Sequence, residues 1–324
     1  MQTLLDEQAL RRRRRINRMH SFALLASQFA LLGLVGWIVA GGVGLSGLVA
    51  GGAAVFMFGP RLRSGLALRW LGVRPVAPEQ APQLMQAVAA LARRAGLSTV
   101  PKLGYRPSYE VNAFTVGRRD DAIIVVTEGL LRALGGRELV GVLAHEVSHI
   151  AGNDLAIMAL ADVAVKMTGF MGRLGILLIL LGLTAALIGA PMPSFALIAV
   201  LVAAPLASAL VQLALSRTRE FEADANAARI TGDPRGLMSA LARISQLQGD
   251  AWERLVLPGR RGVEPSVLRT HPRTKERLRR LRELIAPAET PGPLDLAGLE
   301  RGWAGRPGDF PSPRSPRWRL GGWW

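Results

Sequence analysis

The sequence contains no cysteine, only four histidines and far fewer acidic than basic residues. Without cysteine, disulfide bonds, thiolate metal ligands and cysteine nucleophiles are all excluded. Any metal ion must therefore be bound through His, Asp or Glu. Because there are so few histidines, each can be assessed separately as a metal ligand: His20, His145, His149 and His271. His20 precedes a long apolar stretch, so we interpret it as an interfacial residue and not as a metal ligand.

The shortage of acidic residues leaves a large positive charge, because 24 Asp and Glu stand against 40 Lys and Arg, a formal net charge of +16 over 324 residues. Half of the residues are hydrophobic, which is unusual for a soluble protein of this charge. The combination indicates apolar segments in lipid and a basic remainder that faces an anionic surface. Nucleic-acid binding is the alternative for so basic a chain. Because much of the charge flanks the apolar segments, we expect a lipid bilayer as partner and no nucleic acid.

Long apolar stretches predict membrane-spanning helices, since a bilayer core about 30 Å thick needs roughly 20 helical residues. A double glycine separates the first two stretches, and Pro191-Met192-Pro193 separates the last two. We therefore predict two transmembrane hairpins, at 21–60 and 167–215. The apolar stretches themselves lie at about 21–40, 43–58, 174–190 and 194–215.

The arginines at positions 11–15 set the expected orientation, because positive charge is retained on the cytoplasmic side of a membrane. A cleaved signal peptide is the alternative, but its apolar region would be shorter and would not be followed at once by a second one. If both hairpins cross and return, their charged flanks lie on one side. We therefore expect a basic cytoplasmic N-terminus (1–20) and two cytoplasmic peptidase segments (61–166 and 216–286).

The segment between the hairpins shows a mixed α and β pattern. Apolar residues recur at helical spacing before Gly96, and a continuous apolar run at 122–127 is typical of a strand buried on both faces. Gly152 and Asn153 are plausible terminators of a later helix. The predicted elements are a helix at 79–95, strands at 111–116 and 122–127 joined by a polar turn, and a helix at 137–150.

The later helix carries His145-Glu146-Val147-Ser148-His149. Residues four apart lie on the same face of a helix, so both imidazoles can reach one metal ion. Glu146 is displaced around the helix, where it can meet a metal-bound water without binding the metal itself. The pattern is typical of a zinc-dependent peptidase, in which Glu146 is the general base.

A catalytic zinc ion needs a third protein ligand and an open position for water. The candidates lie in Ser216–Asp224, where the fourth apolar stretch ends. Glu220 and Asp224 share a helix face, so one can bind the metal while the other steadies a histidine. Glu222 points elsewhere. Spacing alone leaves the choice between Glu220 and Asp224 open.

The segments Leu143–Ile150 and Ser216–Asp224 together resemble the HtpX family of bacterial membrane metalloproteases, relatives of the CaaX prenyl endopeptidases. The resemblance runs in order from about Ser21 to Leu284. It implies a mostly helical α+β membrane protein with a gluzincin-type zinc peptidase domain and a small β-sheet. Three shorter segments also agree with it: Asn112-Ala113-Phe114, Thr127–Leu131, and Thr270-His271-Pro272 followed by Arg277.

The resemblance also implies roles for single residues. Glu220 becomes the third ligand of one Zn²⁺, and Asp224 steadies a ligand histidine. His271 and Arg277 would lie beside the metal and stabilise the oxyanion. After Pro272 the family usually has a second proline, and this sequence has Arg273 in its place. On the residues alone, His271 is a loop or helix-cap residue.

The resemblance implies a multi-pass protein of the cell inner membrane, with a cytoplasmic active site that hydrolyses misfolded proteins or peptides in quality control. Two other functions stay open: a zinc-bearing membrane scaffold that does not cut, and prenyl-protein processing. The strand that contains Asn112, Ala113 and Phe114 is expected to pair with an extended substrate, or else to be a structural edge. Residues 287–324, rich in Pro, Gly and Arg, are expected to be disordered.

Overall fold

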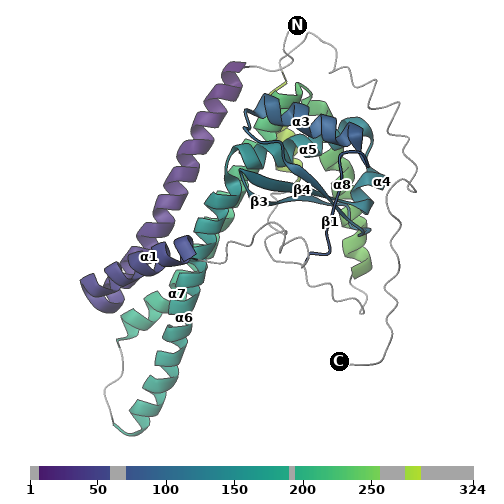
Figure 1. Ribbon diagram of the computed structural model, residues 1–324. Helices are drawn as coiled ribbons and strands as arrows, with labels where there is room; N and C mark the ends of the chain where they lie inside the picture. Colours follow the sequence, from purple (N-terminus) through teal and green to yellow (C-terminus); the bar gives the residue numbers. More distant parts are fainter. Residues whose placement is uncertain (1–6, 59–70, 190–193, 256–273, 286–324) are drawn as a thin grey trace, which may run out of the picture.

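The structure is a computed structural model that describes residues 7–58, 71–189, 194–255 and 274–285. Its N-terminal helix is followed by a sheet-containing segment, two long helices and a helical C-terminal part (Figure 1). The elements are α1 (Glu7–Phe58), β1 (Arg74–Pro75), α3 (Pro82–Ala95), β2 (Lys102–Arg106), β3 (Ala113–Arg118), β4 (Asp121–Thr127), α4 (Glu128–Ala133), α5 (Gly136–Ala151), α6 (Asp154–Leu187), α7 (Phe195–Thr231), α8 (Pro234–Leu255) and α9 (Thr274–Arg282).

Within the described residues, three helices are long and apolar enough to cross a membrane: Leu10–Val39, Asp154–Thr184 and Phe195–Thr231. The second predicted span, 43–58, is helical but belongs to α1 and is not among them. Its 16 residues would extend about 24 Å, which is short of a hydrocarbon core of about 30 Å. α1 changes direction along its length (Figure 1), and Gly41 within it has a φ of +56°.

The long helices α6 and α7 pack closely along one another and extend away from the sheet (Figure 1). A Cβ atom at Gly172 of α6 would lie 2.6 Å from the Pro205 side chain of α7, and one at Gly175 would lie 2.7 Å from the Leu201 side chain. Only glycine therefore permits this approach. Val35 of α1 packs in one apolar cluster with Leu201 and with Met171 of α6, so the three helices form one bundle.

The sheet has four strands in the order β1-β2-β4-β3, so β3 lies at an edge. β3 pairs antiparallel and β2 parallel with the central β4. The prediction that β4 is buried on both faces is confirmed. Ile124 and Val126 point into the main core, while Ile123 and Val125 pack with Phe114 and Val73 on the opposite face.

The helix α5 runs through the main core, between the sheet and the helices α3, α7 and α8. It agrees closely with the predicted helix at 137–150, and α3 ends at Gly96 as predicted, with a φ of +73°. Leu139, Leu143 and Val147 are fully buried along α5. Because its surroundings are so tightly packed, α5 is a rigid support for the polar residues on its remaining face.

Candidate metal centre

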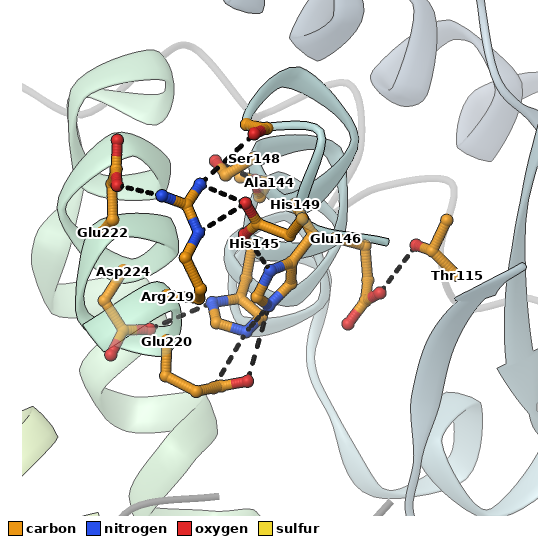
Figure 2. A network of polar contacts seen from close by, with 12 residues as sticks. Thr115, Ala144, His145, Glu146, Ser148, His149, Arg219, Glu220, Glu222 and Asp224 are labelled. Carbon is orange, nitrogen blue, oxygen red and sulfur yellow. Dashed lines mark hydrogen bonds and ion pairs between the residues drawn. The ribbon is translucent and has the colours of Figure 1, made fainter. Parts of the chain in front are cut away.

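The two histidines of α5 and one carboxylate of α7 converge on a common point (Figure 2). The Nε2 atoms of His145 and His149 are 3.0 Å apart. The Glu220 carboxylate lies 3.4 Å from Nε2 of His145 and 3.5 Å from Nε2 of His149. His145 and Glu220 are buried, and His149 is nearly so.

These separations fit a tetrahedrally coordinated metal ion. Ligand atoms about 2.0–2.1 Å from a central ion are about 3.4 Å from one another in a tetrahedron. The two distances to the Glu220 oxygens, one to Oε2 and one to Oε1, are close to this value, and the two Nε2 atoms are somewhat closer together. Two imidazoles and one carboxylate leave a fourth position open, as in catalytic rather than structural sites. The residues therefore fit a metal ion that keeps one exchangeable ligand.

The other ring nitrogen of His145 is held by a carboxylate. Its Nδ1 lies 3.0 Å from Asp224, whose two oxygens accept hydrogen bonds from Arg277 of α9 at 2.7 and 2.8 Å. Arg277 is buried and also contacts Glu220 at 3.3 Å. A carboxylate behind a ligand histidine fixes its tautomer and its ring orientation, so Asp224 and Arg277 together orient His145.

His149 has an equivalent support that our sequence analysis missed. Its Nδ1 lies 2.7 Å from Asp154, the first residue of α6. Asp154 in turn accepts a hydrogen bond of 2.7 Å from Nε of Arg219, which also binds Glu222 at 2.6 Å. Asn153 makes the turn with a φ of +54°, a conformation that asparagine tolerates better than most residues. The turn at Asn153, one of the two residues predicted to end the helix, thus positions Asp154 next to His149.

The carboxylates also govern the electrostatics of the two imidazoles. Burial lowers the pKa of both histidines, but the hydrogen bonds that the imidazoles donate to the neighbouring carboxylates outweigh this effect. The pKa of His145 is raised by Asp224 and Glu220, and that of His149 is raised well above its usual value by Asp154 and Glu220. A metal ion that binds here must therefore displace protons, so its affinity increases with pH.

Glu146 lies apart from this cluster, on the side of α5 that faces β3 (Figure 2). Its carboxylate accepts a hydrogen bond of 2.7 Å from Oγ1 of Thr115, a residue of the edge strand. Thr115 was not among the predicted site residues. No motif marks a single threonine in a strand, and only the packing of β3 on α5 reveals this contact.

The remaining predicted residues are placed as follows. Phe114 points to the face of the sheet away from the main core, whereas Ala113 packs against that core. The backbone N–H of Asn112 bonds to Oγ1 of Thr127, and its carbonyl accepts from the Thr127 N–H. The oxyanion role of Arg277 stays a prediction, since the structure shows its guanidinium engaged by carboxylates. His271 lies outside the described residues.

Comparison with known proteins identifies the family. The family model described as Peptidase family M48 matches residues 78–285, a range that includes both histidines, Glu146, Glu220 and Arg277. The chain belongs to peptidase family M48. It is a metalloprotease, and its apolar helices make it a membrane protein.

Curated relatives of this M48 peptidase cover most of its length. It is 38% identical over 280 residues to a "Protease HtpX homolog" of Acaryochloris marina, covering 82% of this chain and 90% of the relative. A "Protease HtpX homolog" of Pyrococcus abyssi is 36% identical, covering 81% and 93%. The crystal structure of S. mikatae Ste24p aligns with a TM-score of 0.44 and 20% identity over 82% of this chain and 65% of that one. The family assignment rests on the first three comparisons.

Proposed function

We propose that this M48 peptidase is a zinc-dependent integral membrane endopeptidase. In this proposal His145, His149 and Glu220 bind one zinc ion and Glu146 is the general base. The observation that carries it is the convergence of the two Nε2 atoms and the Glu220 carboxylate, which lie 3.0–3.5 Å from one another. A purely structural metal site has no need of a carboxylate next to a ligand histidine in the sequence, so Glu146 favours an enzyme over a scaffold.

When bound, zinc would polarise the scissile carbonyl and lower the pKa of water at the site towards neutral pH. The Glu146 carboxylate accepts a proton from the attacking water and passes it to the nitrogen of the leaving amine. Thr115 holds that carboxylate through one hydrogen bond, and Asp224 and Asp154 hold the two imidazoles. His271 and Arg277 are the proposed partners of the oxyanion, following the resemblance to the HtpX family.

The edge strand β3 is the proposed binding site for an extended substrate. Its only partner among the described strands is β4, so its outer edge is open to another strand. A peptide added there gains main-chain hydrogen bonds and lies along the strand that carries Thr115, the residue in contact with Glu146. Asn112, Ala113 and Phe114 would form the start of this binding edge.

The metal site is close to the bilayer in this proposal. Glu220 follows the last apolar residue of the α7 stretch, Leu215, by five residues, which is about 7–8 Å along a helix. The arginines at positions 11–15, in the first turns of α1, support a cytoplasmic location for this side, with the chain in the cell inner membrane. Following the resemblance to the HtpX family, misfolded membrane or cytoplasmic proteins are the proposed substrates.

Cleavage of an unfolded protein tests the proposal. The detergent-purified chain is incubated with unfolded casein, with and without a zinc chelator, and fragments are followed by mass spectrometry. We expect internal cleavage that stops with chelator and returns when zinc is added. Cleavage that persists after complete removal of metal would rule out a metal-dependent mechanism.

A Thr115→Val variant should cut more slowly while keeping its metal, because Glu146 loses the hydrogen bond that orients it. One such bond contributes about 1 kcal/mol, so we expect kcat/KM to fall by about fivefold to tenfold. Thr115→Ser retains the hydroxyl and should retain most of the activity. Equal rates for the Val and Ser variants would show that this contact does not matter for hydrolysis.

An Asp154→Asn variant should bind zinc more weakly, by about 10–100-fold, since partners behind a ligand histidine contribute on that scale. Titration against a competing chelator measures the affinity. Asp162→Asn is the matched control, because Asp162 lies on the same helix but pairs with Lys166. Similar zinc affinities for the two variants would remove Asp154 from the metal centre.

A further inference from the structure

A small polar cavity lies behind the metal centre, lined by residues of α1, α3, α5, α6 and α7. Its volume is about 90 Å³, several times the roughly 10–15 Å³ that one water molecule needs. Four arginines line it, two from the first turns of α1 and two from α7, whereas only two carboxylates do so among the described residues. These residues are Arg14, Arg18, Arg219 and Arg229, with Asp154 and Glu222.

The two carboxylates are already engaged. Asp154 binds His149 and Arg219, and Glu222 binds Arg219 at 2.6 Å and Arg18 more loosely at 3.6 Å. The cavity therefore carries more positive than negative charge.

The other two arginines form no ion pair with a carboxylate in the described part of the chain. Arg229 donates to the neutral amide oxygen of Asn226 at 2.9 and 3.0 Å. The Nε of Arg14 is buried and has no hydrogen-bond partner within that same part. The charges of Arg14 and Arg229 are close enough to oppose each other. Arg14 is half-buried and Arg229 is exposed, so solvent screens part of this repulsion, and an anion between the two guanidinium groups would offset the rest.

The rim of the cavity at Arg18 lies near the depth expected of lipid headgroups. The uncharged stretch of α1 begins at Ser21, so Arg18 and Arg14 precede it by about 5 and 10 Å along the helix. The polar layer on each side of a bilayer core is about 5–8 Å thick. The first turns of α1, drawn in purple, rise beyond the bundle towards the level of the peptidase part (Figure 1).

We propose that this cavity binds a phosphate oxyanion, held by Arg14, Arg18 and Arg229 and supplied by an anionic phospholipid headgroup or by free phosphate. Guanidinium groups suit this ligand because their parallel N–H donors match the spacing of phosphate oxygens. Arg219 lies on the same wall and binds Asp154, which binds His149. A bound phosphate would thus join α1 to the two helices that carry the metal ligands. This inference does not depend on the proposed zinc chemistry.

The test uses the full chain in lipid nanodiscs. Protein in phosphatidylcholine nanodiscs is titrated with inorganic phosphate, and with sodium chloride at equal ionic strength, while the unfolding temperature is followed. A second sample contains phosphatidylglycerol, and native mass spectrometry counts the lipid that stays bound after transfer to detergent. Arg14→Gln is compared with Arg15→Gln, which removes the same charge from an exposed neighbour that does not line the cavity.

We expect either inorganic phosphate or phosphatidylglycerol to stabilise the parent and the Arg15→Gln variant. The Arg14→Gln variant should need a concentration of that ligand at least about tenfold higher for the same stabilisation. Stabilisation by inorganic phosphate identifies a free anion, whereas retention of phosphatidylglycerol alone identifies a headgroup. Should Arg14→Gln fail to fold, Arg18→Gln at the exposed rim of the cavity takes its place. Equal responses of the cavity variant and Arg15→Gln, or no response to either ligand, would overturn the proposal.

Discussion

A Glu146→Gln variant is expected to bind one metal ion per chain, as the parent does, and to lose peptide hydrolysis by at least about 10²–10⁴-fold. The amide has nearly the same size as the carboxylate and can still accept the hydrogen bond from Thr115, so the packing around it is preserved. It cannot accept the proton of the attacking water, however. Elemental analysis gives the metal content, and a fluorogenic peptide gives the rate.

The matched control is Glu138→Gln, which changes a carboxylate two turns earlier on the same helix. Glu138 accepts hydrogen bonds from the backbone N–H of Gly135 and from the Ser239 hydroxyl, and it lies away from the histidines. We expect this control to retain activity. Full activity in Glu146→Gln would assign the general base to another residue.

A Glu220→Gln variant is expected to lose both metal and activity. The variant replaces a charged ligand with a neutral and weaker one, and the Arg277 guanidinium loses one of its two carboxylate partners. Because changing a residue behind a ligand costs about 10–100-fold in affinity, loss of a ligand itself should cost more than about 100-fold. Equilibrium dialysis against zinc buffers measures the affinity, and peptide cleavage measures the activity.

Glu222→Gln is the control for this prediction, since Glu222 lies on the same helix but binds Arg219 instead of the histidines. Its metal content should remain that of the parent. If Glu220→Gln retained its metal while an Asp224→Asn variant lost it, the third ligand would be Asp224.

The peptidase helix and its chemistry could be predicted because the relevant signals are local. Two histidines four residues apart point in one direction wherever a helix forms, and the apolar run of β4 marks a strand buried on both faces. The end of α3 at Gly96 was equally local, since the left-handed turn there favours glycine.

The third ligand could not be chosen from its own neighbourhood. Glu220 and Asp224 lie on the same face of α7, and only the packing of α7 against α5 decides which of them meets both Nε2 atoms. The structure places Glu220 there and Asp224 at Nδ1 of His145. The family resemblance implied the same arrangement.

Other features of the fold and the site could not be predicted, because they arise from contacts between segments far apart in the sequence. β2 contains a glycine and a lysine and pairs in parallel with β4, so neither its composition nor a hairpin turn marked it. Asp154 was missed because it acts through the turn at Asn153, and Arg219 because an arginine beside a membrane stretch is most simply interpreted as a topological signal. Each belongs to the site only once α5, α6 and α7 are packed together.

The central claim is that His145, His149 and Glu220 together hold a catalytic zinc ion. X-ray absorption at the zinc edge of the purified protein tests it most directly. The prediction is one zinc ion per chain with two imidazole nitrogens and oxygen ligands at about 2.0–2.1 Å. A protein that cuts peptides without bound zinc, or a zinc spectrum without imidazole scattering, would contradict it.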